Sequence, residues 1–152
     1  MAPVFHWAKV RAFSHATEDP ETVRGLLTEL TGVEEVDVET AEGHHGNPIL
    51  IMEATLWNSG KINAMYESLG LDILRRASSE TEDRLDEDLV FHLRLDKQEL
   101  AMGNRMLSAG GDTVTVLGKV IAHPAKREVA LANLSDFLEK VTRRLARPPA
   151  SP

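Results

Sequence analysis

The chain contains five segments in which β-branched, aromatic and aliphatic residues dominate or alternate with polar ones, and we predict a β-strand in each. The third segment is apolar almost throughout, whereas the second alternates Val36 and Val38 with acidic residues, the pattern of a half-buried strand. The predicted strands are residues 4–15, 33–40, 49–57, 89–95 and 113–123.

Apolar residues recur at helical spacing between these strands. A first helix is predicted around Pro20, after capping candidates at 17–19, and Gly32 is expected to end it. A second helix is predicted from residues 58–60 through Leu69, with a continuation through Ile73 and Leu74 left open because Gly70 weakens it. A short helix is predicted over residues 96–102 and a long one after Pro124, whereas residues 78–88 are predicted to form a polar connector.

The resulting order, β-α-β-β-α-β-(α)-β-α, predicts an α+β fold. The economical architecture is a mostly antiparallel sheet with its helices packed on one face. The other face is then free for solvent or a partner. With 152 residues, the chain suits a single α+β domain, which we place at residues 1–146, and residues 147–152 are predicted to be a disordered tail.

Composition narrows the function classes. The chain is 42% hydrophobic and 27% charged, as in ordinary globular proteins, and it has no cysteine, which excludes disulfides and thiolate metal sites. No apolar run reaches the ~20 residues of a membrane helix, and the N-terminus lacks the pattern of a signal peptide. We therefore predict a cytoplasmic protein without a membrane partner.

The formal net charge of −7 argues against a general nucleic-acid binder, because contact with phosphates needs positive charge. The position of the basic groups matters more than their sum. In the first predicted strand, one alternating set is small and apolar apart from His6, and we expect it to face the helices. The opposite set interleaves aromatic and basic groups: Phe5, Trp7, Lys9, Arg11, Phe13 and His15.

Two further predicted strands place Arg94 and Lys119, with His92 and His123, on the same free face. Basic side chains neutralise phosphates and aromatic rings stack on bases, so this face is a candidate RNA-binding surface. The alternative is a solvated strand face that carries charge for solubility and against edge pairing. A slip of one residue in a strand would invert its assignment.

A polar turn at residues 43–48 carries His44, His45 and Asn47 between two glycines. These side chains offer hydrogen bonds and stacking planes to bases or sugars. An ordinary Gly- and Asn-rich turn is the alternative. Adjacent histidines seldom chelate one ion, and we predict no metal site there.

The segment from Arg94 to Gln98 adds Lys97 to the basic candidates. Arg94 and Lys97 could extend the basic face, or the charges of this segment could form surface ion pairs of ~0–1 kcal/mol each.

Sequence patterns of common enzymes are missing: the chain has no phosphate-binding P-loop, no dinucleotide glycine fingerprint and no nucleophile elbow. Ser14 and His15 are adjacent, but in a strand their side chains lie on opposite faces. We therefore predict a protein that is not an enzyme and has no cofactor. A hydrolase or metal enzyme that uses His15, His44 and His45 is the least favoured alternative.

Three stretches resemble an archaeal family of small predicted RNA-binding, exosome-associated proteins, and the likeness spans roughly residues 4–142. The stretch His44-His45-Gly46-Asn47-Pro48 is the most specific part. The resembling stretches are residues 10–19, 43–49 and 94–98 with Gly103 after them.

This resemblance implies a fold similar to the ribosomal protein that binds 5S RNA. It also implies a non-catalytic RNA-binding role in RNA processing or turnover, with RNA and exosome- or ribosome-related proteins as partners. The leading hypothesis is sequence-tolerant RNA binding; the alternative is a protein-interaction subunit or homodimer that buries the aromatic face. The candidate RNA-binding residues are Lys9, Arg11, Phe13, His15, His44, His45, Asn47, Arg94, Lys97 and Lys119.

Overall fold

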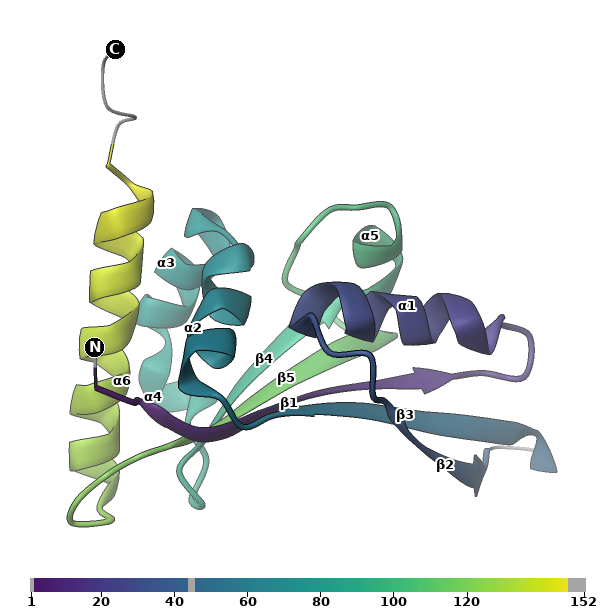
Figure 1. The fold of residues 1–152 in the computed structure, drawn as a ribbon, viewed down its shortest axis with the longest axis horizontal. Coiled ribbons are helices and arrows are strands. Elements are labelled where there is room, and N and C mark those ends of the chain that lie inside the picture. The colour runs from purple at the N-terminus through teal and green to yellow at the C-terminus, as the bar shows by residue number, and fades with distance from the viewer. Residues whose placement is uncertain (1, 44–45, 148–152) are drawn as a thin grey trace.

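The computed structural model describes residues 2–43 and 46–147, which form one five-stranded antiparallel sheet with six helices. The helices all lie over one face of the sheet (Figure 1). This confirms the predicted α+β class and the predicted placement of the helices. The strands are β1 (Phe5–Ser14), β2 (Asp37–Glu42), β3 (Pro48–Leu56), β4 (Val90–Asp96) and β5 (Thr113–Val120).

The sheet has the order β2-β3-β1-β5-β4, so β1 is the central strand and β2 and β4 are the edges. Since every pair is antiparallel, residues in register across the sheet point to the same face. The helices are α1 (Pro20–Thr31), α2 (Ser59–Ser68), α3 (Leu71–Ser79), α4 (Thr81–Arg84), α5 (Lys97–Ala101) and α6 (Arg127–Leu145).

The first helix has the ends that its sequence predicts. Asp19 is the N-cap, and its carboxylate accepts a hydrogen bond from the Glu21 amide at 3.0 Å. Pro20 occupies the first turn, where its missing N–H costs nothing. Gly32 ends the helix in the left-handed conformation, with φ of 73°.

The predicted second helix is divided in the structure. Gly70, with φ of 93°, separates α2 from α3, because a left-handed residue cannot continue an α-helix. The predicted polar connector contains the short helix α4. The predicted tail lies outside the described residues from residue 148 onward.

The core lies between the sheet and the helices. Alternate residues of β1, β4 and β5 are buried there, among them Val10, Leu93 and Val116, which are fully buried. The longest helix, α6, adds Leu134, Phe137 and Leu138. No helix in the described part of the chain is long and apolar enough to cross a membrane.

The start of β1 departs from the predicted alternation. The register with β5 shifts between Phe5 and Trp7, so the backbone is irregular there. Phe5 is therefore buried and stacks on Tyr66, with ring centroids 4.8 Å apart, whereas His6 is exposed. The prediction that Phe5 faces outward and His6 faces the helices is wrong, because a bulge reverses the parity of a strand.

Candidate nucleic-acid interface

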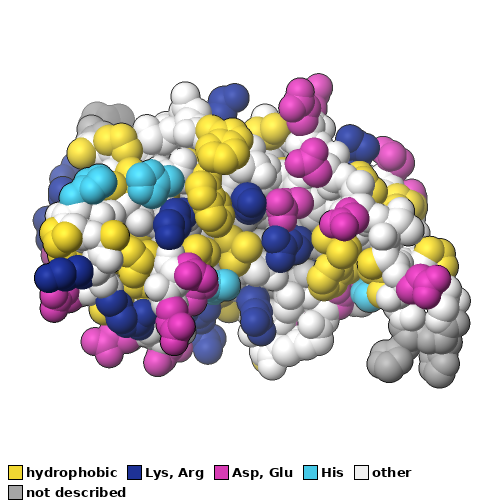
Figure 2. Space-filling model, turned by 90° about the horizontal axis from the view of Figure 1, so that it is seen from below, with side chains coloured by type: hydrophobic (Ala, Val, Ile, Leu, Met, Phe, Trp, Pro, Cys, Tyr) yellow, Lys and Arg dark blue, Asp and Glu magenta, His cyan; other side chains and the backbone are white. Residues whose placement is uncertain are grey.

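The face of the sheet opposite the helices, which we call the open face, carries the outward side chains of all five strands. Figure 2 shows dark blue Lys and Arg side chains among yellow hydrophobic ones across the middle of this face. Magenta acidic side chains lie toward the end where Figure 1 shows the β2–β3 hairpin, and a further group lies at the opposite end of this view. The open face therefore combines charge and apolar surface.

Strand register orders the basic groups in rows that cross the sheet. Arg11 of β1 is opposite Thr115 of β5, which is opposite Arg94 of β4, so two arginines flank one threonine. Two residues along β1, Lys9 lies in the next row, and Lys119 follows in the row after that, opposite Trp7. Neighbouring strands are ~4.8 Å apart and rows ~6.6 Å apart, so these four cations lie within one compact area.

Nearby acceptors partly neutralise these cations. Arg11 Nη2 lies 2.7 Å from Glu53 Oε2, and Lys9 Nζ lies 3.7 Å from Glu53 Oε1. Lys119 donates to the backbone carbonyl of Asp88. Arg94 is exposed and has no ion-pair partner among the residues that the structure describes. Arg94 is thus the cation on this face that is most available to a ligand.

Aromatic rings lie beside the basic groups. The Lys9 ammonium is 4.9 Å from the Trp7 ring centroid, a cation–π contact. Phe13, at the other end of β1, is 43% exposed. The structure therefore places Trp7, Lys9, Arg11 and Phe13 on one face of β1, as their alternation predicts.

Trp57 is an aromatic residue that the set of RNA-binding candidates missed. It is 71% exposed and directly follows β3. Ala8 pairs with Leu56, so continuing the register by one residue puts Trp57 opposite Trp7. The predicted strand at residues 49–57 already included Trp57. Its position beside Trp7 follows only from the pairing of β3 with β1, which the sequence does not show.

The β2 side of the open face is acidic. Glu53 follows Arg11 in the same row, and Asp37 of the edge strand follows Glu53. In the next row Glu39 lies opposite Ile51, which lies opposite Phe13. These acidic residues line a groove of about 400 Å³ together with Arg11, Phe13 and Val38. Charge is therefore distributed unevenly over the open face. Its Lys and Arg side chains lie on β1, β4 and β5, whereas Asp37, Glu39 and Glu53 lie on β2 and β3.

The predicted loop contact lies at the turn between β2 and β3. Asn47 is exposed, and its carbonyl accepts a hydrogen bond from the Gly43 amide at 2.7 Å. Gly46 has a φ of 73°, which favours glycine. His44 and His45 lie outside the described residues.

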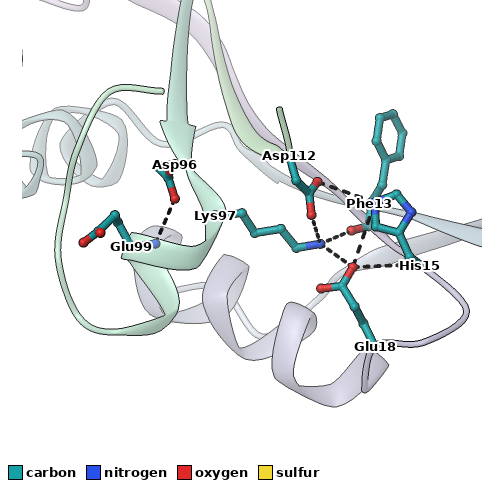
Figure 3. A network of polar contacts seen from close by, with 7 residues as sticks. All are labelled: Phe13, His15, Glu18, Asp96, Lys97, Glu99 and Asp112. Carbon is teal, nitrogen blue, oxygen red and sulfur yellow. Dashed lines mark hydrogen bonds and ion pairs between the residues drawn. The ribbon is translucent and has the colours of Figure 1, made fainter. Parts of the chain in front are cut away.

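Lys97 does not lie on the open face, so the prediction that it extends the basic face is wrong, whereas the alternative that its charge forms ion pairs is confirmed. Lys97 begins α5 and is 3% exposed, and its ammonium group donates three hydrogen bonds (Figure 3). The acceptors are the Phe13 carbonyl at 2.5 Å, Glu18 Oε1 at 2.7 Å and Asp112 Oδ2 at 3.0 Å. A buried ammonium group needs such partners, and here they engage all three of its protons.

His15 lies at the edge of this Lys97 cluster. Its Nε2 is 3.6 Å from Asp112 Oδ1 and 4.0 Å from Glu18 Oε1. The His15 amide donates to Glu18 Oε1 at 3.1 Å, which closes the turn between β1 and α1. Burial raises the pKa of Glu18, but hydrogen bonds from Lys97 and the His15 amide outweigh burial and hold that pKa below its ordinary value.

The ligand atoms of His15, Glu18 and Asp112 lie within 4.8 Å of one another, as in a metal site. The Lys97 ammonium, however, already lies between the two carboxylates and neutralises them. A divalent cation would have to bind next to this positive charge, which costs Coulomb energy. The residues present therefore fit a metal poorly while Lys97 stays in place.

Ser14 and His15 do not form a catalytic pair. Ser14 is 2% exposed on the helix side of the sheet, and its hydroxyl has no hydrogen-bond partner among the described residues. His15 is exposed and turns to Asp112. The two side chains diverge, as alternation in a strand predicts.

The fold and the open face define an α+β protein with a free, mixed basic and aromatic sheet surface. A family model described as RNA binding matches residues 7–120, which is more than half of the chain. The chain belongs to this RNA-binding family.

A protein of Pyrococcus abyssi named RNA-binding protein PAB1135 is 35% identical over 144 residues, covering 88% of this chain and 94% of the relative. Among solved structures, protein AF2318 from Archaeglobus fulgidus, of the DUF54 family, is 35% identical with a TM-score of 0.77 and covers 88% of this chain and 99% of its own. A DUF54 protein from Methanothermobacter thermautotrophicus is 34% identical with a TM-score of 0.77, covering 89% and 98%.

Proposed function

We propose that the chain binds single-stranded RNA, without catalysing a reaction, through the basic half of its open face. Basic side chains there contact phosphates, and aromatic rings stack on bases with little regard to sequence. The proposed contact residues are Lys9, Arg11, Arg94 and Lys119 for phosphates and Trp7, Phe13 and Trp57 for bases.

The observation that carries this proposal is the arrangement of Arg11, Lys9 and Lys119 in successive rows beside Trp7, with Arg94 across the sheet. The distance from Trp7 to Phe13 along β1 is six residues, or ~20 Å, enough for a few nucleotides. The acidic residues of β2 and β3 repel phosphates, so the phosphates are expected over the basic side chains, while Phe13, which borders the acidic groove, contacts a base. Membership of the RNA-binding family supports the same partner.

The test is fluorescence anisotropy with a labelled single-stranded RNA at low salt. Arg11→Ala combined with Arg94→Ala is expected to weaken binding at least tenfold and to lower the salt slope by about 1.4, since each phosphate contact on a single strand contributes about 0.7.

The matched control is Lys140→Ala combined with Arg143→Ala on α6, where both side chains form exposed i,i+4 ion pairs. It removes the same two charges and should leave RNA affinity within about twofold. If both double variants lose affinity equally, net charge and not the open face determines binding, and the proposed surface is wrong.

The resemblance to exosome-associated proteins supports a finer proposal, an accessory role in RNA processing or turnover in the cytoplasm. The residues His44, His45 and Asn47 between β2 and β3, together with His15, are proposed as further base contacts. Purified exosome incubated with labelled RNA and this chain tests the role: the chain should change the rate of degradation, and the Arg11→Ala, Arg94→Ala variant should not.

A further inference from the structure

A cavity lies beyond the end of β1, between α1 and α5. The Lys97 cluster, which consists of Lys97, Glu18, Asp112 and His15, forms part of its lining. The volume of the cavity is about 310 Å³, at the lower end of the range for small-molecule sites. Val23 and Leu26 of α1 and Ala101 of α5 supply an apolar wall. The cavity can therefore hold a flat, partly apolar group of the size of a nucleobase.

The opposite wall is rich in hydrogen-bond acceptors. Glu18 and Asp112 each give one carboxylate oxygen to the Lys97 ammonium. The other oxygen of Asp112, Oδ1, lies 3.6 Å from His15 Nε2, which is longer than a hydrogen bond, and accepts no hydrogen bond from any side chain in the described part of the chain. The Lys97 ammonium pairs with both carboxylates, and each carboxylate keeps an oxygen outside this contact that can accept from a ligand.

The cavity adjoins the Phe13 end of β1, because His15, which follows β1, is part of its lining. Phe13 and His15 are two residues apart at the end of β1, so their positions differ by ~6.6 Å, comparable with one nucleotide step of an extended strand. The Lys97 ammonium also binds the Phe13 carbonyl, which fixes the cavity relative to the exposed Phe13 ring. A strand that stacks one base on Phe13 brings its next nucleotide to His15, at the mouth of the cavity.

We propose that the cavity receives the base of one nucleotide of a bound RNA strand and selects guanine. Guanine presents two adjacent donors, N1–H and the N2 amino group, which match the two oxygens of a carboxylate or two neighbouring carboxylates. Adenine and cytosine place a ring acceptor beside their amino group, and uracil flanks its single N–H with carbonyls; both arrangements turn acceptors toward Asp112 and Glu18. The Gln98 amide, also in the lining, is a donor available for guanine O6.

This inference rests on the proposed function, so its test separates the two. Anisotropy titrations compare four labelled oligouridines that carry guanosine, inosine, adenosine or uridine at one central position. The guanosine strand should bind about tenfold more tightly than the adenosine and uridine strands, since one good paired contact to a base discriminates by that order, and the inosine strand should fall between them. Inosine lacks only the N2 amino group and isolates its contribution.

Two variants locate the preference. Asp112→Asn replaces an acceptor oxygen by a donor amide, and Ala101→Leu adds bulk to the apolar wall while it changes no member of the Lys97 cluster. Both should remove the preference for guanosine and keep the affinity for plain oligouridine, which the open face supplies. Thermal unfolding of both variants checks that they are folded.

Equal binding of all four strands by the wild type would overturn the cavity proposal and leave RNA binding by the open face intact. A guanosine preference that survives Ala101→Leu would also overturn it, because the base would then lie elsewhere. Absence of binding to every strand would contradict both proposals.

Discussion

Lys97 shows how one buried charge organises the region where β1, α1 and α5 meet. Its ammonium joins the Phe13 carbonyl, Glu18 and Asp112, groups that lie 84, 79 and 15 residues away in the sequence. The local sequence pattern predicted that Lys97 is an exposed basic residue. It could not indicate the three acceptors, because none of them is near Lys97 in the sequence. Burial of Lys97 could not be predicted without the tertiary fold.

Replacing Lys97 by Met keeps the aliphatic stem but removes the ammonium group. The remaining carboxylates then face each other without a cation, and we expect the free energy of unfolding to fall by about 2 kcal/mol, less than for a fully buried pair because both carboxylates are about one third exposed. Urea denaturation of the wild type and the variant measures this loss.

The same variant should gain affinity for a divalent cation, since His15, Glu18 and Asp112 lose the competing charge. Zn²⁺ is expected to raise the Tm of Lys97→Met and not that of the wild type. Lys61→Met, at an exposed lysine of α2, is the matched control and should change neither stability nor Zn²⁺ response. Unchanged stability of Lys97→Met would show that the ammonium does not hold the cluster together.

At the scale of elements, alternation along β1, β4 and β5 predicted the outward placement of Lys9, Arg11, Arg94 and Lys119, because period-two patterning is a local property. It failed at Phe5, where the register shift reverses the faces. The bulge depends on how β1 pairs with β5, and the sequence of β1 alone carries no signal for that.

Gly118 is a strand position that packing reserves for glycine. A Cβ there would lie 2.9 Å from the Phe5 ring and in direct conflict with the Tyr66 hydroxyl, both of which are buried. We expect Gly118→Ala to lower the free energy of unfolding by about 1–3 kcal/mol through overpacking.

Gly25 in α1 offers the matched control, because a Cβ at that position meets nothing within 4 Å. Gly25→Ala should stabilise the chain by about 0.5–1 kcal/mol through helix propensity. Denaturant titrations measure the free energy of unfolding of both variants. Equal changes of the same sign would show that Phe5 and Tyr66 do not restrict the side chain at position 118.

For the whole molecule, the net charge of −7 describes the open face poorly. Acidic residues gather over β2 and β3, whereas Arg11, Arg94 and Lys119 lie over the other three strands. The strand order that separates them, with β1 in the centre, arises from pairings distant in sequence. The order of elements along the chain was predictable from its pattern, and the division of charge across the sheet was not.

The most direct test of RNA binding by the open face is mapping of amide chemical shifts on the ¹⁵N-labelled chain as single-stranded RNA is added. The largest changes are expected in β1, β5 and β4, around Arg11, Lys119 and Arg94, with reversal at high salt. Changes confined to the basic residues of α3 and α6, or no changes at low salt, would contradict the proposed interface.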